Sequence, residues 1–316
     1  MLNWFKMLPL LIAALFMLGA CAPAQTARAD NVPRVVCTDF PCYDFARAVA
    51  GDWAQLKLLI HPGAEVHSYE PSPTDILAIA ECDLFVYIGG ESDVWADDIL
   101  ESFGDDAPAS IRLIDCVQAL EEETREGMTL HEGHEHEPGE TEYDEHIWTS
   151  PVNAGRMVDA VCEALCAVSP GNAARYTQNA QAYESEIGAI DAAFRTVVAD
   201  GARQELIFAD RFPFLYFVRE YGLNYYAAFP SCAAESEPSA RTMAFLIDRI
   251  ERDGIPAIYT IELSNQRTAR VIAEETGARI LTFYSAQNVS EADFAAGETY
   301  VSLMWRTVDA LKEGLG

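Results

Sequence analysis

Residues 55–90 read QLKLLIHPGAEVHSYEPSPTDILAIAECDLFVYIGG. Two short apolar runs, at 56–60 and 84–88, flank the sequence Ser72-Pro73-Thr74-Asp75. Serine is a good N-cap, proline fits the first helical position, and an acid in the first turn suits the helix dipole. A strand, a helix and a second strand in this order indicate a parallel β-sheet, because parallel strands need a crossover connection.

The same alternation continues along the chain. Further strand-like runs occur at residues 35–36, 111–114, 206–208, 225–229, 257–261 and 280–283, with helix-like segments between most of them. One such helix is expected over 240–252, ending at Gly254, and another from Ser264 to near Gly277. This pattern predicts an α/β protein with two parallel-sheet lobes.

A long amphipathic pattern lies between the two sets of strands. Its apolar residues alternate in steps of four and three for about seven turns: Tyr176, Ala180, Tyr183, Ile187, Ile190, Phe194 and Val197. We expect a linking helix within 169–202, capped by Ser169 ahead of Pro170, between an N-terminal lobe at 33–168 and a C-terminal lobe at 203–316. A coiled coil is the alternative, but it needs more sustained heptads with charged flanking positions.

The first residues have the order of an export signal. Lys6 precedes an apolar run at 7–17 that is too short to span a bilayer, and Leu18-Gly19-Ala20-Cys21 resembles the bacterial lipobox. The resemblance implies a signal peptide at 1–20, a lipidated Cys21 and a tether at 21–32. We therefore expect a protein anchored by lipid to the outer face of the bacterial cytoplasmic membrane, with secretion without a lipid as the alternative.

Composition excludes some partners. The formal net charge is −29, and residues 1–20 contribute a single lysine to it, so nucleic acid and anionic lipid are poor partners. Seven cysteines follow Cys21, at positions 37, 42, 82, 116, 162, 166 and 232, without the CxxC pairs of a zinc ribbon or redox motif. We expect most of them to be buried as small hydrophobic residues.

All six histidines lie between positions 61 and 146. His131, His134 and His136 fall in an acidic, glycine-containing segment near 127–142 that is expected to be an exposed loop. Such a loop can scavenge zinc weakly or serve only as a solvated linker. Their spacing does not match the HExxH motif of zinc proteases.

His67 and His146 each lie in a loop just before a Ser-Pro helix start, at Ser72-Pro73 and Ser150-Pro151. In parallel α/β folds, ligands bind beyond the carboxyl ends of the strands, which is where such loops lie. A single histidine in such a place is more often structural than functional. The pair therefore needs support from its surroundings.

That support comes from a resemblance. The motifs PGAxxHxYEPSP at 62–73 and DxHxWxxP at 144–151, with the His-rich loop and the linking helix, resemble zinc- and manganese-binding lipoproteins of ABC importers over essentially the whole mature chain. The resemblance implies two lobes joined by a rigid helix, with a metal held in the cleft by His67 and His146. It further implies a monomer that delivers a divalent metal to a permease and its ATPase and that catalyses no reaction.

The C-terminal lobe departs from the pattern of the family. Where the family has a His or Glu before a helix ending in Tyr-Gly-Leu, this chain has Arg211, and a guanidinium cannot ligate a metal. Asp210 can substitute, and Tyr284 falls where the family's last aspartate is usual. Glu262, at the end of a predicted strand, is a second available carboxylate, with a supporting or capping role as the equal alternative.

The predicted site is thus His67, His146, Asp210 and Glu262, with Zn²⁺ as the expected ligand and Mn²⁺ or Fe²⁺ as alternatives. Arg211 is expected to neutralise a nearby carboxylate. Two other classes of function stay open: a metal-dependent hydrolase or chelatase, and a surface adhesion protein with a vestigial cleft. The sequence contains no nucleophile elbow, GxGxxG turn or phosphate loop, which are motifs that would favour an enzyme.

Overall fold

The computed structural model describes residues 32–129, 142–231 and 237–316. Cys21 and the histidines at 131, 134 and 136 lie outside the described residues. From Pro33 to Gly316 the chain forms one compact unit. Within the described part, no helix is both long enough and apolar enough to cross a membrane.

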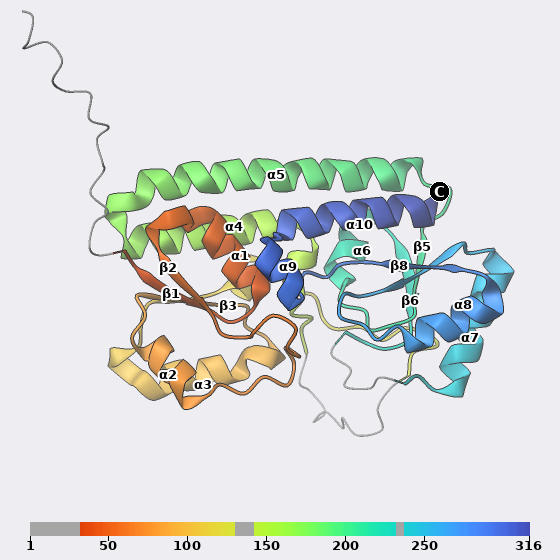
Figure 1. Cartoon of the computed structure of the whole chain (residues 1–316), viewed down its shortest axis with the longest axis horizontal. Helices are drawn as coiled ribbons and strands as arrows, with labels where there is room; N and C mark the ends of the chain where they lie inside the picture. The colour runs from red at the N-terminus through yellow and green to blue at the C-terminus, as the bar shows by residue number, and fades with distance from the viewer. Residues whose placement is uncertain (1–31, 130–141, 232–236) are drawn as a thin grey trace, which may run out of the picture. The chain divides into compact units, whose positions relative to one another are not determined.

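The N-terminal sheet contains four parallel strands in the order β2-β1-β3-β4 (Figure 1). They are β1 (Arg34–Cys37), β2 (Gln55–Leu58), β3 (Leu84–Tyr87) and β4 (Ser110–Arg112). The sequence predicted all four of these strands and their parallel direction. Because β2 and β3 lie on opposite sides of β1, the order reverses between β1 and β3, which is where such sheets bind ligands.

Alternating side chains of this sheet pack against two helical layers. Val35 and Val86 face α1 (Phe40–Ala50) and α4 (Pro151–Val168). Val36 and Phe85 face α2 (Pro73–Ala80) and α3 (Val94–Phe103). Ser72 caps α2 in a reciprocal capping box with Asp75, which confirms the predicted helix start.

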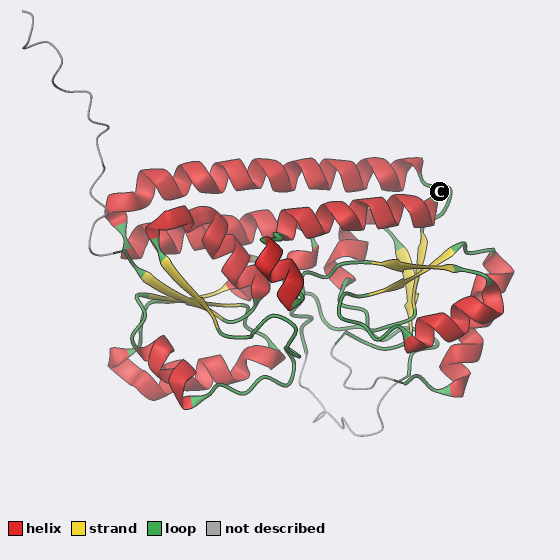
Figure 2. Cartoon of the chain, in the orientation of Figure 1, coloured by secondary structure: helices red, strands yellow, loops and turns green. Residues whose placement is uncertain are grey.

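The C-terminal sheet repeats this topology, in the order β6-β5-β7-β8, again fully parallel. Its strands are drawn in yellow in Figure 2. Its strands are β5 (Glu205–Phe208), β6 (Asn224–Ala227), β7 (Ala257–Thr260) and β8 (Arg279–Thr282). One face packs against α7 (Ala240–Asp253) and α8 (Arg267–Thr276). The other face packs against α6 (Leu215–Tyr221) and α10 (Tyr300–Leu315), and α9 (Glu291–Ala296) follows β8.

The long helix α5 (Ala173–Asp200) contacts α1 and α4 of the first lobe and α10 of the second (Figure 1). Six of its seven predicted apolar positions are buried, and Val197 is half-buried. Its predicted start was wrong by one turn. Ser169 precedes a 3-10 turn at Pro170–Asn172, which winds more tightly than an α-helix. The α-helix therefore begins only after this turn, with Asn172 as the residue before α5.

The predicted start of α8 was also wrong. Ser264 does not cap it; the helix begins at Arg267, after Leu263 and Gln266 adopt positive φ values of 62° and 55°. The end of α7 at Gly254 was predicted correctly, with this glycine in the left-handed conformation. The remaining short 3-10 turns are Gly51–Trp53, Glu91–Asp93, Gly104–Asp106, Leu113–Cys116 and Ile147–Thr149.

Six cysteines lie in the described residues, and all six are free thiols. Cys37, Cys42, Cys82 and Cys162 are buried, and Cys116 and Cys166 are half-buried. Burial raises the pKa of the Cys37 and Cys42 thiols, so they stay protonated in the core of the first lobe. They act there as small apolar side chains, as the sequence predicted.

Candidate metal centre

His67, Glu145 and His146 lie together, with one potential ligand atom from each within 4.8 Å of the others. The two imidazole rings are 5.6 Å apart between centroids. His146 and Glu145 are buried, and His67 is half-buried. The structure therefore brings together the two histidines that the sequence selected, and it adds a carboxylate that the sequence analysis did not select.

The segment of His146 is fixed by contacts from both lobes. The Asp144 N–H donates to Leu120 O at 2.9 Å, and Tyr216 of α6 donates its hydroxyl to Asp144 O at 2.7 Å. After His146 the chain enters a 3-10 turn, in which the Thr149 hydroxyl donates to His146 O at 2.8 Å. These bonds set the direction of the imidazole before any ion binds.

The orientation of the His146 ring follows from Asp144. Asp144 Oδ1 accepts both the His146 backbone N–H, at 2.8 Å, and the ring nitrogen Nδ1, at 3.0 Å. No described residue gives the other ring nitrogen, Nε2, a hydrogen-bond partner, although it is buried. Burial acts to lower the pKa of His146, but the Asp144 carboxylate outweighs it and raises this pKa. In the neutral ring, Nε2 carries the lone pair available to a metal.

His67 is held in a similar way by Ser92 and Glu145. Its Nδ1 lies 2.8 Å from Ser92 Oγ and 3.3 Å from Glu145 Oε1. The Ser92 hydroxyl donates to Glu145 Oε1 at 2.5 Å, so its oxygen is left as an acceptor. The His67 proton must then sit on Nδ1, which leaves the lone pair on Nε2. Both imidazoles therefore offer Nε2 to a ligand.

Glu145 is a candidate site residue that the sequence did not indicate. Burial acts to raise its pKa, but the hydrogen bond from His67 and the charges of both histidines outweigh burial and lower it to about 2. Gly90 makes room for this carboxylate, since an added Cβ would lie 2.6 Å from Glu145 Oε2. Asp144 and Glu145 are neighbours in sequence and each orients one histidine. The only signal in the sequence was this pair of acids directly before His146.

Two further carboxyl groups are fully buried near Glu145. Burial raises the pKa of Asp39 to about 7 and that of Asp93 to about 8. The negative charge of Glu145 also raises both pKa values, and the charge of Asp39 raises that of Asp93. Asp93 Oδ2 accepts the backbone N–H groups of Ile88 and Gly89 at 2.9 and 3.1 Å. Asp39 caps α1 by accepting the Cys42 N–H at 3.1 Å. Both fix the backbone beside the metal centre.

Asp210 lies outside the cluster of His67, Glu145 and His146. Its Oδ1 accepts the Arg211 N–H at 2.9 Å, while among the described residues its buried Oδ2 finds no hydrogen-bond partner. Burial raises the pKa of Asp210. Arg211 itself reaches the other lobe, where its guanidinium contacts both oxygens of Glu65 at 3.4 and 3.2 Å. The expected neutralising role of Arg211 is therefore visible as this ion pair.

Glu262 also lies outside the cluster. Its two carboxylate oxygens accept the Ser285 N–H at 2.7 Å and the Ser285 hydroxyl at 2.6 Å. Burial raises its pKa while these bonds act in the opposite direction. Tyr284 lies beneath the Arg306 guanidinium, 5.6 Å from the ring centroid. Glu262 thus holds the loop after β8 in this structure, which is the supporting role that the sequence left open.

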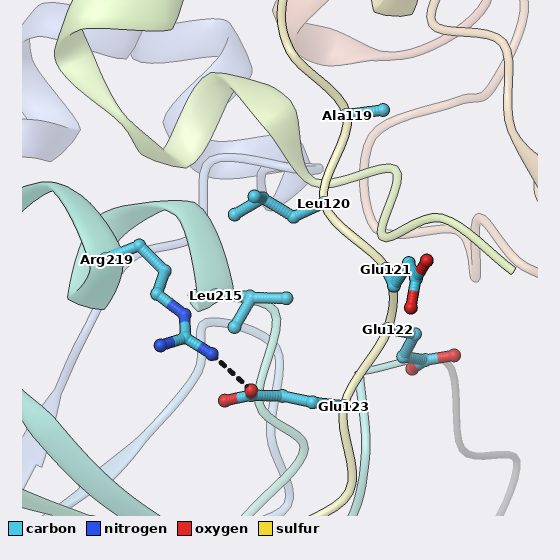
Figure 3. A pocket seen from close by; sticks show the side chains of 7 residues that line it. All are labelled: Ala119, Leu120, Glu121, Glu122, Glu123, Leu215 and Arg219. Carbon is cyan, nitrogen blue, oxygen red and sulfur yellow. Dashed lines mark hydrogen bonds and ion pairs between the residues drawn. The ribbon is translucent and has the colours of Figure 1, made fainter.

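A shallow groove lies beside the segment that leads to Asp144, and it is a separate feature (Figure 3). Leu120, Leu215 and Arg219 line it with the acidic run at 121–123, and Arg219 pairs with Glu123. Tyr225 also donates its hydroxyl to Glu123, at 3.0 Å. The groove contains neither histidine of the metal centre. Its Glu123 and Arg219 side chains are already engaged in a contact between the two lobes.

The donor set of the cluster suits a borderline divalent ion. Two neutral imidazoles, one buried and one half-buried, present lone pairs, and each ring is oriented by a carboxylate through its other nitrogen, as in many zinc sites. The His146 Nε2 atom, buried without a described partner, is the kind of atom that an ion would satisfy. Zinc, manganese and ferrous iron all accept such ligands.

Comparison with known proteins adds to this geometry. The family model described as zinc-uptake complex component A, periplasmic (ZnuA) matches residues 35–314. The chain belongs to the ZnuA family. The match spans both lobes and the long helix, so it confirms the resemblance and the two-lobe fold inferred from the motifs.

Two curated relatives illustrate the range of the ZnuA family. The zinc-binding lipoprotein AdcA of Streptococcus pneumoniae is 31% identical over 311 residues, which are 98% of this chain and 61% of that protein, so the chain spans about three-fifths of that relative. The high-affinity zinc uptake system protein ZnuA of Bacillus subtilis is 30% identical over 313 residues, covering 96% of both chains. The crystal structure of the Zn(II)-bound ZnuA-like domain of pneumococcal AdcA matches with a TM-score of 0.75 at 28% identity, covering 90% of this chain and 99% of that one.

Proposed function

We propose that this protein binds Zn²⁺ outside the cytoplasm and delivers it to an ABC-type importer. The observation that carries the proposal is the pair of His67 and His146, each with Nδ1 tied to an acidic or hydroxyl group, so that the lone pair of Nε2 is the one available to an ion. Membership of the ZnuA family and the zinc-binding names of its relatives support the choice of metal. No chemistry on a substrate is required.

The metal ligands that we propose are His67 and His146 from the N-terminal lobe. Asp210 remains a candidate from the C-terminal lobe because its buried Oδ2 has no partner among the described residues. Glu262 is the weaker candidate, since both of its oxygens already accept hydrogen bonds from Ser285. Glu145 supports His67 from behind in the way that Asp144 supports His146.

Delivery is proposed to require a membrane anchor and a partner. Lipidation of Cys21 would keep the protein, as a monomer, near a permease that is driven by a cytoplasmic ATPase. The acidic His-rich segment is proposed as an auxiliary zinc scavenger through His131, His134 and His136. Globomycin-sensitive processing of the exported protein tests the anchor, because this inhibitor blocks cleavage before a lipidated cysteine.

Metal analysis of the tag-free protein tests the binding proposal. We expect one tightly bound zinc per chain, lost in His67→Ala and in His146→Ala, with zinc displacing manganese and iron in competition. His61→Ala is the matched control, because His61 is exposed on the same loop as His67. Wild-type protein without stoichiometric metal, or equal binding by all three variants and wild type, would refute the proposal.

A further inference from the structure

The loop at residues 284–289, which we call the β8–α9 loop, is joined to the loop that carries His67. Asn288 is buried, and its side-chain amide donates to His61 O at 3.0 Å and to Ala64 O at 2.8 Å. In return, the Gly63 N–H donates to Val289 O at 2.8 Å. The two lobes are therefore connected by hydrogen bonds beside the metal centre.

The backbone of the β8–α9 loop is strongly constrained. Glu262 accepts two hydrogen bonds from Ser285, and Trp148 donates its indole N–H to Ser285 O at 2.8 Å. The next residue, Ala286, is fully buried with φ at 58°. A left-handed alanine costs about 1 kcal/mol and persists only where its surroundings enforce it. The position of Gln287 is thus set by contacts with both lobes.

The side chain of Gln287 points at a metal-binding atom. Its Nε2 lies 3.3 Å from His67 Nε2. Because Ser92 and Glu145 fix the His67 proton on Nδ1, His67 Nε2 is an acceptor, and the amide NH₂ of Gln287 is the group that donates to it. The amide therefore engages the same lone pair that a metal ion would use.

We propose that Gln287 contributes a ligand to the bound ion from the C-terminal lobe. This inference rests on the proposed function. A half-turn of the amide exchanges its NH₂ for the carbonyl oxygen Oε1 without any movement of the backbone, since the last torsion of glutamine is soft and roughly two-fold. The NH₂ covers His67 Nε2 in the metal-free protein, and Oε1 becomes a ligand when the ion takes that lone pair.

A neutral amide gives the site a distinct character. Its carbonyl oxygen is a harder donor than imidazole and suits divalent ions such as manganese as well as zinc. It adds no charge, so the ion is held less strongly than it would be by a carboxylate at the same place. The exchange of one contact for another further limits the affinity, which favours release to a partner.

Two substitutions test this inference by calorimetric titration of the tag-free protein with zinc and with manganese. Gln287→Leu keeps the approximate size and removes both polar atoms, and we expect zinc affinity to fall by about tenfold or more. Gln287→Glu supplies a charged oxygen, and we expect affinity for both ions to rise by about tenfold. Gln204→Leu and Gln204→Glu are the matched controls, because Gln204 is exposed ahead of β5.

The outcomes separate this inference from the proposed function. If Gln287→Leu binds zinc as tightly as wild type or more tightly while His146→Ala abolishes binding, Gln287 only covers His67 and the inference is overturned. If the wild type itself binds no stoichiometric metal, the proposed function fails instead. Side-chain ¹⁵N NMR gives a second readout, because the Gln287 NH₂ signal should shift on zinc loading in wild type. An unchanged signal in the loaded protein would also overturn the inference.

Discussion

The substitution Asp144→Asn isolates what a charge contributes to the metal centre. A single oxygen of Asp144, Oδ1, accepts both hydrogen bonds from His146. The amide oxygen of asparagine can occupy the same place and accept the same two bonds. The variant therefore keeps the orientation of the ring and loses the negative charge, whereas Asp144→Ala would also leave two buried N–H groups unsatisfied.

The magnitude follows from the supporting role of this carboxylate. Replacing the group that orients a metal-bound histidine typically weakens metal binding about 10- to 100-fold, which corresponds to about 1.4 to 2.8 kcal/mol. The pair is almost fully buried, with 0% and 2% of the two side chains exposed, so solvent does little to screen the lost charge. We therefore expect Asp144→Asn to bind zinc about 10- to 100-fold more weakly than wild type at pH 8.

The pH dependence supplies a sharper signature. The Asp144 carboxylate raises the pKa of His146, so in the wild type protons compete with zinc at higher pH than they would at an unsupported imidazole. Asparagine removes that effect, and the pKa of His146 falls. The wild type consequently loses more zinc affinity than the variant on acidification. The ratio of wild-type to variant zinc affinity should therefore fall from pH 8 to pH 5.5.

Competition titrations with a zinc chelator across this pH range measure both effects. Asp105→Asn, at an exposed position, controls for the change in net charge. A variant that binds as tightly as wild type at pH 8 would contradict the supporting role of Asp144. If the ratio of wild-type to Asp144→Asn zinc affinity stays constant with pH, the proposed effect of Asp144 on the pKa of His146 is contradicted.

Two further predictions concern stability. The folded-state pKa of Asp93 is raised to about 8 from an ordinary value of 3.8, so its contribution to stability is complete below about pH 4 and is lost as pH rises through 8. Asp93→Asn should flatten this decline by up to about 1.4 kcal/mol per pH unit in urea titrations, and an unchanged slope would refute the shift. A Cβ on Gly314 of α10 would lie 1.8 Å from Tyr259 Oη, so Gly314→Ala should destabilise the protein by about 1–3 kcal/mol. Gly188 of α5 has no such neighbour, and Gly188→Ala should stabilise by up to about 1 kcal/mol; the same sign for both variants in thermal melts would refute the packing argument.

The fold was predictable because its signals are local. Each strand is a short apolar run, and helix starts such as Ser72-Pro73 carry their caps within four residues. The start of α8 was missed because Ser264 looks like a cap in isolation. In the structure, Leu263 and Gln266 instead have positive φ values. Such values are expected mainly at glycine, so the sequence gives no sign of them here.

The candidate site was only partly predictable. His67 and His146 stood out by their motifs, and the structure places them together, while ligation itself stays a prediction. Glu145 contacts Ser92 from 53 positions away, and Gln287 contacts His67 from 220 positions away. Such partners are created by the approach of separate loops, and nothing in their local sequence marks them.

The sequence predicted negatively charged ligands in the C-terminal lobe, at Asp210 and Glu262, whereas the structure places the neutral amide of Gln287 against His67. A carboxylate ligand and an amide ligand differ in how they would interact with the charge of Arg211. Its cation is paired with Glu65 of the other lobe, on the same loop whose Ala64 O accepts a hydrogen bond from Asn288. The positive charge of Arg211 is thereby neutralised by Glu65, and the proposed Gln287 ligand adds no charge of its own. A carboxylate at position 287 would bind the ion more tightly, mainly by slowing its dissociation, whereas the proposed delivery to an importer requires the ion to dissociate.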